Sequence, residues 1–329
     1  DMSDEEYRNN LYSLWTNYCV SESYEPGSTF KPVTVASALE EGVVKDGDTY
    51  VCKGFETVAD YKLKCHVFST IGSHGSLTVE QALMNSCNPY MIHLALEMGN
   101  SRFAYYQSLF GFGKTTGIDL PGETTGIVYG DRMTTIDAAC NSFGQTINVN
   151  MMQMMAAYCS IINGGMLYQP HIVKRIESAN GEVVKEYKAN LVRQTITAST
   201  SKLLRRYLKN TVEEGTAKKA GVTGYSVAGK TGTAQKGDRK DNKWIISFIG
   251  HAPAENPKFA IYVVIDEPYG TTGTSGSSAD VLTLTHNILE KLLPYMNVYK
   301  DASDEYEDTS SSPDELTVDG IPAGTASSN

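Results

Sequence analysis

The order of the predicted elements constrains the fold of this chain more than any other feature of its sequence. Helices are predicted over residues 28–41, 78–86, 89–98, 150–163 and 199–214. Three strand-like segments then follow one another, over 226–235, 243–252 and 258–265, before a last helix over 279–293. Helices followed by a block of strands and a closing helix indicate an α+β domain, in which an antiparallel sheet is packed by helices.

Smaller β features lie between the helices. Residues 49–54 and 61–68 each alternate between polar and apolar side chains, which predicts two short strands that can pair with each other. Asn180-Gly181 is a strong signal for a hairpin turn. Residues 100–130 are rich in glycine, and we expect them to form loops.

The acidic charge of the chain is concentrated at its C-terminal end. The net charge is −10, but residues 301–329 carry eight acidic side chains and no Lys or Arg, which leaves about −2 for the rest. This predicts a domain over 1–296, followed by an acidic disordered tail or linker over 297–329. The near-neutral domain has no basic stripe, so nucleic acid is not an expected partner. No apolar run of about 18 residues occurs, so we expect no membrane-spanning helix within the chain.

Three short motifs carry chemistry, and the first is Ser28-Thr29-Phe30-Lys31, an S-x-x-K after the turn signal Pro26-Gly27. Positions i and i+3 of a helix share one face, so the Ser28 hydroxyl and the Lys31 amine can meet. A serine needs a neighbouring base to become a nucleophile, and burial can lower the pKa of a lysine enough for that task. The backbone N–H of Ser28, at a helix start, can also bind an oxyanion. The alternative is a capping serine followed by a surface lysine.

The second motif is Ser86-Cys87-Asn88, an S-x-N. Its serine can relay protons between the lysine and a leaving group, and its asparagine can hold a substrate amide. We expect Cys87 to point into the protein. The alternative is an ordinary helix end, where Ser and Asn are common.

The third motif is Lys230-Thr231-Gly232-Thr233, a K-T-G followed by threonine on a predicted strand. Lys230 can bind a carboxylate, Gly232 can let a substrate approach the backbone, and the N–H of Thr233 can be a second oxyanion donor. Alone, this is compatible with an ordinary edge strand. The three motifs together, in this order, are a known pattern of enzymes that acylate a serine.

Longer stretches resemble class B penicillin-binding proteins, above all the sporulation type of Gram-positive spore formers. The resemblance covers nearly all of residues 13–293. The stretches that carry it are YEPGSTFKP (24–32), SHGSLTVEQALMNSCNP (73–89), GIDLPGE (117–123), SFGQ (142–145), NGG (163–165), TVEEGTA (211–217) and VAGKTGTAQ (227–235). The resemblance implies the α+β fold of penicillin-binding proteins and serine β-lactamases, in which an antiparallel sheet is packed by helices beside an all-helical subdomain. Relatives carry a strand upstream of the S-x-x-K region, so we expect one strand of the sheet to be missing here.

The resemblance implies a peptidoglycan D,D-transpeptidase that needs no cofactor for catalysis. Ser28 would attack the D-Ala-D-Ala carbonyl of a stem peptide with Lys31 as base, and the acyl group would pass to an amine of a neighbouring stem. Ser86 would relay protons, and Asn88 would hold the substrate amide. β-Lactams would acylate the same serine.

The resemblance also implies a substrate-binding strand, partners and a location. Lys230 and Thr231 to Thr233 would hold the C-terminal carboxylate and complete the oxyanion hole. Expected partners are stem peptides, lipid-linked precursors and a glycosyltransferase of the shape, elongation, division and sporulation type. The expected location is the extracytoplasmic face of the membrane, with an N-terminal anchor helix outside this chain.

A serine β-lactamase and a β-lactam sensor are the rival interpretations. A β-lactamase needs a base that activates water on the acyl-enzyme, and no E-x-x-L-N segment lies between Asn88 and Lys230. The long similarity to biosynthetic transpeptidases argues against a sensor, and the complete motifs argue against a scaffold with a dead site.

Cysteine and histidine residues gather around the two short predicted strands. If these strands pair, Cys52 and Cys65 come close, and Asp60 and His66 could complete a tetrahedral structural zinc site, with His74 as an alternative fourth ligand. Two packed thiols without metal are our first interpretation, zinc the second and a Cys52–Cys65 disulfide the third.

Overall fold

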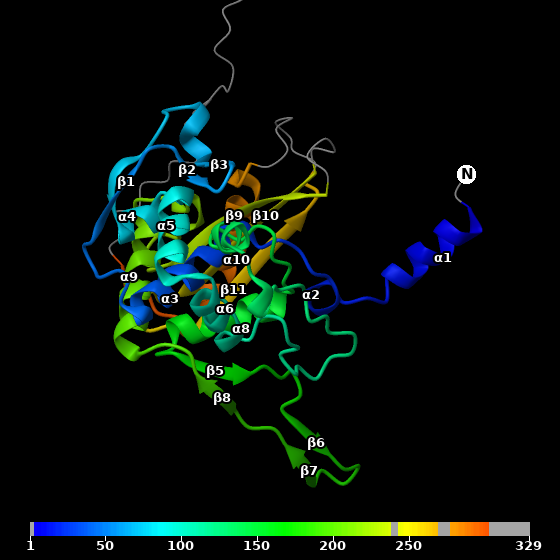
Figure 1. Cartoon of the computed structure of the whole chain (residues 1–329). Helices are drawn as coiled ribbons and strands as arrows, with labels where there is room; N and C mark the ends of the chain where they lie inside the picture. The colour runs from blue at the N-terminus through cyan, green and yellow to red at the C-terminus, as the bar shows by residue number, and fades with distance from the viewer. Residues whose placement is uncertain (1–2, 238–242, 269–276, 303–329) are drawn as a thin grey trace, which may run out of the picture.

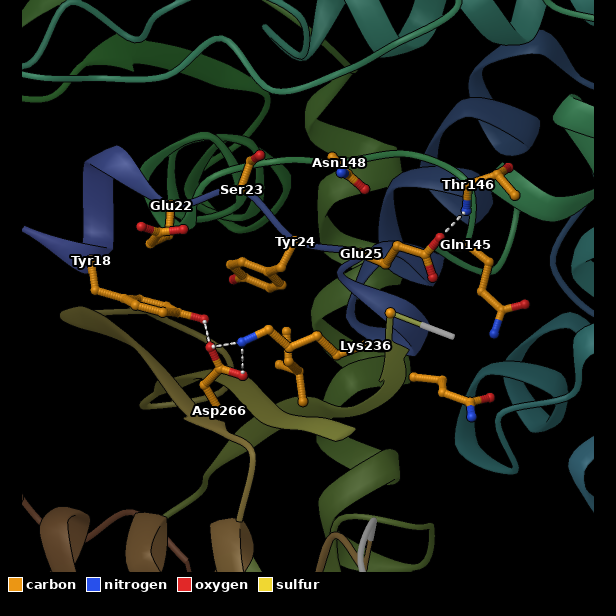
Figure 2. Close-up of a pocket in the computed structure, with 13 residues that line it drawn as sticks. Tyr18, Glu22, Ser23, Tyr24, Glu25, Gln145, Thr146, Asn148, Lys236 and Asp266 are labelled. Carbon is orange, nitrogen blue, oxygen red and sulfur yellow. Dashed lines mark hydrogen bonds and ion pairs between the residues drawn. The ribbon is translucent and has the colours of Figure 1, made fainter. Parts of the chain in front are cut away.

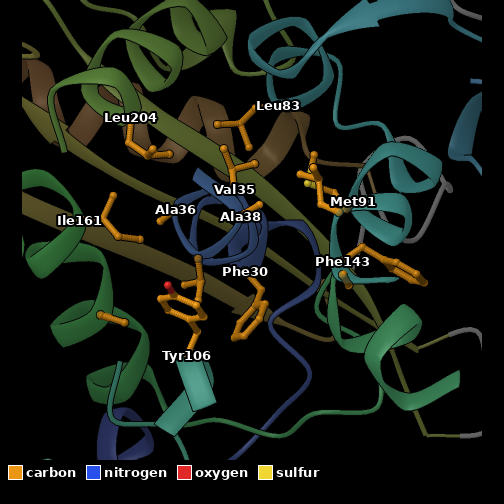
Figure 3. Packing of buried hydrophobic residues seen from close by; sticks show 14 of the residues in the cluster. Phe30, Val35, Ala36, Ala38, Leu83, Met91, Tyr106, Phe143, Ile161 and Leu204 are labelled. Atoms are coloured by element: carbon orange, nitrogen blue, oxygen red, sulfur yellow. The ribbon is translucent and has the colours of Figure 1, made fainter. Parts of the chain in front are cut away.

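A buried helix, α3 (Lys31–Glu41), lies at the centre of the fold. The computed structural model describes residues 3–237, 243–268 and 277–302 of the chain. The α3 residues from Lys31 to Ala38 are buried on every side of the helix, as expected when other elements enclose it. Figure 3 shows the apolar side chains that surround it. The helix predicted over 28–41 is thus confirmed, with its first turn, η1 (Gly27–Phe30), wound as a 3-10 helix.

Several other helices pack around α3. The predicted ones are confirmed with small shifts at their ends, as α4 (Val79–Met84), α5 (Asn88–Met98), α8 (Met151–Ile162) and α9 (Ala198–Glu213). In Figure 3, Leu83 of α4, Met91 of α5, Ile161 of α8 and Leu204 of α9 all point toward α3. This shell buries the N-terminal turn of α3, where Lys31 lies.

Two helices of this shell were not predicted from the sequence. The loop expected over 100–130 is wrong at its start, because residues 100–109 form α6 (Asn100–Leu109). Buried Phe103 and Tyr106 anchor α6 in the main core, and such packing can stabilise a helix whose own periodicity is weak. The other helix, α7 (Thr135–Asn141), begins with a capping box between Thr134 and Asp137.

The main sheet is antiparallel, as predicted. Its strands are β9 (Ala228–Lys236), β10 (Lys243–Ala252) and β11 (Phe259–Asp266), in the order β11-β10-β9. Side chains of β10 alternate between two cores, with Ile245 and Ile249 in the main core and Ile246 and Phe248 in a second core with α10 (Ala279–Tyr295). The predicted α+β architecture, a sheet between layers of helix, is therefore confirmed (Figure 1).

The pairing predicted for the two short strands is wrong. β1 (Thr49–Cys52) pairs with β4 (Gly75–Thr78), while β2 (Phe55–Val58) pairs with β3 (Tyr61–Lys64). The chain turns at Gly54, which has a left-handed backbone (φ 88°) and lies so close to the Gly72 carbonyl that a Cβ would be 2.0 Å from its oxygen. This turn separates β1 from the β2–β3 hairpin and directs it to β4.

The remaining elements lie mostly at the periphery: α1 (Asp4–Ser13), α2 (Tyr18–Ser21), η2 (His66–Ser69), η3 (Gly130–Arg132), β5 (Met166–Gln169), β6 (Arg175–Glu177), β7 (Val183–Glu186), β8 (Asn190–Gln194) and η4 (Lys218–Ala220). The hairpin predicted at Asn180-Gly181 is confirmed, and it connects β6 and β7 (Figure 1). Among the described helices, none is long and apolar enough to cross a membrane. The predicted tail begins too early, because residues 297–302 pack on the domain, with Val298 in the second core and Asp301 hydrogen-bonded to Ser226. The rest of the predicted tail, from 303 onward, lies outside the described residues.

Candidate active site

The Ser28 turn is held tightly between a loop and a strand. The Gly27 N–H donates to the Gly144 carbonyl at 2.9 Å, and both glycines have left-handed backbones (φ 55° and 80°). A Cβ on Gly144 would lie 2.0 Å from the Gly27 oxygen, and one on Gly27 would lie 2.6 Å from the Thr233 oxygen. Only glycine fits at these two positions. The SFGQ segment and the K-T-G-T strand therefore fix the position of Ser28.

Lys31 joins the first motif to the second. Its side chain is fully buried, and Nζ donates to Ser86 O (2.6 Å), Ser86 Oγ (3.0 Å) and Asn88 Oδ1 (2.6 Å). Burial lowers the pKa of Lys31 to about 8. The sequence predicted contact between Lys31 and the Ser28 hydroxyl, whereas here the three donors of the amine are directed at the S-x-N motif.

Ser86 has a strained backbone that directs two of its oxygens at one amine. Its φ of 54° lies in the left-handed region, which costs a non-glycine residue roughly 1–3 kcal/mol. Ser86 N–H donates to Leu83 O (3.2 Å) and Cys87 N–H to Ala82 O (2.8 Å), so the end of α4 holds this conformation. Such strain is often found at functional sites.

Lys230 lies behind Thr231 rather than at the surface of the cleft. Its fully buried Nζ is 3.2 Å from Thr231 O and 3.3 Å from Thr231 Oγ1. Burial, and then the charge of Lys31, lowers the pKa of Lys230. Lys230 thus reaches a bound substrate through the Thr231 hydroxyl, whereas the sequence predicted direct contact with a carboxylate.

Gly232 is required for a different reason from the predicted one. A Cβ there would lie 2.5 Å from Ser247 Oγ and 2.8 Å from Thr29 Cγ2. The position therefore faces β10 and the Ser28 turn, not the substrate. The glycine lets β9 approach η1, which brings Thr233 beside Ser28.

The motifs meet in a cleft of about 380 Å³. It is lined by Ser28, His66, Ser86, Asn88, Phe143, Gln145, Thr216, Thr231, Thr233, Trp244 and Ser278. None of these described lining residues is a carboxylate. The sequence predicted five of them as substrate or catalytic residues, and it predicted His66 as a zinc ligand instead. The His66 Nε2 lies 2.9 Å from the Asn85 carbonyl, which orients the ring beside the cleft.

Two of the unpredicted lining segments were visible in the sequence without an assigned role. Phe143 and Gln145 belong to the SFGQ stretch, and Thr216 belongs to TVEEGTA. Thr216 N–H donates to Met84 O at 3.2 Å, and its hydroxyl lies 3.4 Å from that of Thr231. Thr216 therefore ties α4 to β9 across the cleft.

The assembled groups can acylate and deacylate a serine. Nucleophilic catalysis on a carbonyl requires an accessible nucleophile, a base and donors for the oxyanion. The site supplies a half-buried serine hydroxyl, a buried lysine whose pKa is lowered, a second hydroxyl that accepts a hydrogen bond from that lysine, and two nearby backbone N–H groups. These groups define a serine acyl-transferring enzyme.

Comparisons with known proteins identify the family. Residues 2–290 match the family described as "Penicillin binding protein transpeptidase domain". The chain is 41% identical over 288 residues to stage V sporulation protein D of Bacillus subtilis (86% of this chain, 44% of that protein), and 32% identical over 292 residues to peptidoglycan D,D-transpeptidase FtsI of Escherichia coli (87% and 46%). The chain belongs to the penicillin-binding protein transpeptidase family.

A solved structure gives the same result for the fold. Penicillin-binding protein 3 of Mycobacterium tuberculosis, complexed with aztreonam, superposes with a TM-score of 0.78 at 29% identity, over 88% of this chain and 66% of that chain. This chain spans less than half the length of the two curated relatives named above. The penicillin-binding protein fold implied by the sequence is thus confirmed.

Beside the cleft, the structure brings together four potential metal ligands that differ from the predicted set. The ligand atoms of Cys52, Cys65, His74 and Cys87 all lie within 4.8 Å of one another. The His74 Nδ1 is 3.8 Å from the Cys52 sulfur and 3.5 Å from the Cys65 sulfur. All six cysteines of the chain are free thiols, so Cys52 and Cys65 do not form the disulfide considered above.

The predicted ligands Asp60 and His66 do not belong to this group. Asp60 lies in the exposed turn between β2 and β3, and His66 faces the catalytic cleft. The reason is the pairing of β1 with β4. Cys52 lies opposite Gly75, and His74 is the residue directly before Gly75 in the chain. The alternative ligand His74 is therefore the one that the fold brings close.

The S-x-N motif supplies the fourth member of the cluster. Cys87 is fully buried, as predicted, and its thiol donates a hydrogen bond to Cys65. This hydrogen bond lowers the pKa of Cys65 and raises that of Cys87. A lowered pKa favours the thiolate form of Cys65, which is the form that binds metal ions.

Proposed function

We propose that this chain is a peptidoglycan D,D-transpeptidase domain in which Ser28 forms the acyl-enzyme. The observation that carries the proposal is the buried Lys31 amine, held by Ser86 and Asn88 one helical turn from Ser28. The names of the relatives support the substrate class, because one of them is a peptidoglycan D,D-transpeptidase.

In the first half-reaction, neutral Lys31 takes the proton of Ser28 as Oγ attacks the carbonyl of the D-Ala-D-Ala bond. The N–H groups of Ser28 and Thr233 bind the oxyanion. When the C–N bond breaks, Ser86 passes the proton from Lys31 to the nitrogen of the departing D-Ala. The Thr231 hydroxyl, with Lys230 behind it, binds the terminal carboxylate.

In the second half-reaction, an amine of a neighbouring stem attacks the ester carbonyl. Lys31 and Ser86 remove a proton from this amine and return one to Ser28 Oγ as the ester bond breaks. The products are a cross-linking amide and free serine. Hydrolysis by water is slow in this scheme, because the described lining of the cleft contains no carboxylate base.

The test is intact-protein mass spectrometry after exposure to penicillin. We expect one adduct, on Ser28, and none in a Ser28→Ala variant with an unchanged thermal melt. Ser28 tolerates this change structurally because it is half-buried at the cleft. An adduct of equal yield in folded Ser28→Ala protein would contradict the proposal.

We further propose that Cys52, Cys65, His74 and Cys87 hold a structural zinc ion. Three sulfurs and one imidazole nitrogen are a common zinc ligand set, and tetrahedral coordination at about 2.3 Å separates ligand sulfurs by about 3.8 Å. The four ligand atoms lie within 4.8 Å of one another, so only small shifts of these side chains would bring them to coordination distance. Four protein ligands leave no position for water, so the ion would be structural and catalysis would not depend on its chemistry.

Elemental analysis of protein purified without added metal tests this site. We expect close to one equivalent of zinc in the parent protein and a large loss in His74→Ala. The matched control is Asp60→Ala, because Asp60 is exposed and belongs to the set predicted from the sequence. Loss of zinc in Asp60→Ala but not in His74→Ala would restore the earlier ligand set, and zinc-free parent protein would leave packed thiols.

The location and partners follow from the proposed substrate. Cross-linking acts on peptidoglycan strands, which lie outside the cell membrane and which a glycosyltransferase must first polymerise. We therefore propose action at the extracytoplasmic face of the membrane, on stem peptides made available by such a partner.

A further inference from the structure

A second cavity, of about 400 Å³, adjoins the catalytic cleft (Figure 2). Gln145 lines both, so the two spaces meet at the SFGQ loop. The second cavity is lined by Tyr18, Glu22, Ser23, Tyr24, Glu25, Gln145, Thr146, Asn148, Gln235, Lys236, Gly237, Ile245 and Asp266. It belongs to no step of the mechanism described above.

Strand β9 runs along both spaces. Thr231 and Thr233 line the catalytic cleft, and Gln235, two residues further on, lines the second cavity. Alternate residues of a strand face the same side, about 7 Å apart. β9 is also an outer strand of the described sheet, so an extended peptide can add beside it. A donor whose reacting carbonyl lies at Thr233 would therefore place its preceding residue near Gln235.

Among the described residues that line the second cavity, carboxylates outnumber ammonium groups. Lys236 is already paired, with Asp266 at 2.8 Å and with Glu267 at 3.0 Å, and Tyr18 OH donates to the same Asp266 at 3.1 Å. Glu22 and Glu25 supply two further carboxylates to the described lining. Half-buried Glu25 accepts a hydrogen bond from Thr146 N–H at 2.8 Å, which fixes it at the end of the cavity next to Gln145 (Figure 2).

Tyr24 forms a buried part of the wall of the second cavity. Tyr24 is only 5% exposed, and its phenolic oxygen is enclosed beside the hydroxyl of Tyr262. In Figure 2 its side chain lies among the lining residues, between Tyr18 and Glu25.

We propose that the second cavity binds the side chain of the donor residue that precedes D-Ala-D-Ala, and that Glu25 and Glu22 recognise an ammonium group at its end. The inference rests on the proposed function. Transpeptidation requires an amine on the acceptor stem, and donor and acceptor stems of one polymer share the same diamino residue. A carboxylate-lined cavity one residue beyond the reacting carbonyl is therefore suited to that ammonium.

Two penicillins that differ only at the end of the side chain test the inference. One ends in a free ammonium and the other carries the same amine acetylated, because a β-lactam places its side chain where the donor residue would lie. We expect Ser28 to be acylated roughly tenfold faster by the penicillin with the free ammonium, because one charge-assisted hydrogen bond contributes a factor of about this size. The readout is the second-order rate constant of adduct formation, measured by intact mass.

Glu25→Gln is the central variant, since glutamine can still accept the Thr146 N–H bond but carries no charge. We expect the rate ratio between the two penicillins to fall toward one in Glu25→Gln. It should fall by about two- to threefold in exposed Glu22→Gln, a change that cannot disturb the core. Glu186→Gln, on the distant β7, is the matched control and should keep the parent ratio.

The outcomes separate this inference from the proposed function. Normal acylation by the acetylated penicillin with a ratio near one in the parent protein would overturn the inference alone. Failure of both penicillins to modify Ser28 would overturn the proposed function as well.

A third penicillin, whose side chain ends in both an ammonium and a carboxylate, distinguishes two kinds of diamino residue. A rate above that of the ammonium compound assigns a diamino diacid, and an equal or lower rate assigns a lysine-like residue.

Discussion

At the scale of single residues, burial determines the chemistry of the site. Lys31 and Lys230 are both enclosed, yet only Lys31 is directed at the hydroxyl of Ser86. Lys230 instead supports Thr231 from behind. The two lysines thus differ in role because of what surrounds each amine, not because of their residue type.

The pH dependence of acylation follows from the burial of Lys31. Only the neutral amine can take the proton of Ser28, and burial lowers the pKa of Lys31 to about 8. Acylation by penicillin should therefore rise with pH and level off above a midpoint near pH 8. At pH 6 it should be roughly a hundredfold slower than the plateau, because about 1% of the amine is neutral there. Rate constants that stay constant between pH 6 and 9 would exclude Lys31 as the base.

Substitution of Lys31 tests the same role without titration. Lys31→Ala should slow acylation by about 10²–10⁴ or more, the usual contribution of a positioned base. Lys31→Arg should not restore the rate, since a guanidinium stays protonated. The measurement is the rate of adduct formation in variants with circular dichroism spectra like that of the parent. Near-normal acylation in Lys31→Ala would assign the base to another group.

At the scale of elements, the site depends on close backbone contacts. The Ser28 turn, the SFGQ loop and strand β9 meet through Gly27, Gly144 and Gly232, where a side chain would collide with a neighbour. The oxyanion donors therefore owe their spacing to three glycines far apart in sequence.

Gly144→Ala should damage both stability and acylation. A left-handed backbone costs alanine about 1–2 kcal/mol, and the Cβ would also lie 2.0 Å from Gly27 O, which must displace the Ser28 turn. Gly42→Ala is the matched control, because Gly42 has a similar φ of 76° but nothing within 4 Å of its Cβ position. We expect both variants to lose stability in urea, but only Gly144→Ala to acylate at least about tenfold more slowly. Equal acylation rates in the two variants would show that this contact does not position Ser28.

At the scale of the whole molecule, the cysteine cluster connects the β1–β4 pair to the catalytic centre. Cys52 lies on β1, Cys65 follows β3, His74 precedes β4, and Cys87 lies between Ser86 and Asn88. An ion bound by these four residues would connect the S-x-N motif to the β1–β4 pair and to the β2–β3 hairpin.

Removal of the proposed zinc should lower stability more than activity. Metal bound only by the folded state adds its binding free energy to folding. Treatment with a strong chelator should therefore lower the thermal midpoint of the parent by at least about 5 °C, and should have no effect on His74→Ala. Differential scanning calorimetry measures both. An unchanged midpoint in zinc-loaded parent protein after complete removal of the metal would exclude a structural role.

The whole cleft also predicts the lifetime of the acyl-enzyme. Since its described lining has no carboxylate to activate water, the penicillin adduct should persist for many minutes. Recovery of free protein can be followed by mass after removal of excess penicillin. Recovery within seconds would indicate β-lactamase activity.

The sequence by itself determined the central helix, the three-stranded sheet and the three motifs. These depend on local patterns: the i, i+3 spacing of Ser28 and Lys31, and the alternation along β9 to β11. Such patterns are encoded by neighbouring residues, because the periods of helix and strand fix which side chains share a face. These local features do not depend on how distant segments of the chain pack.

Only the tertiary structure decided which distant segments meet. No local pattern distinguishes β3 from β4 as the partner of β1. The pairing with β4 replaced Asp60 and His66 by His74 and Cys87 in the cluster. The close approach of Gly144 to Gly27 and the cavity beside Gln235 are likewise contacts between remote segments. Strand pairing and loop packing depend on the closure of the whole core, so no local pattern contains them.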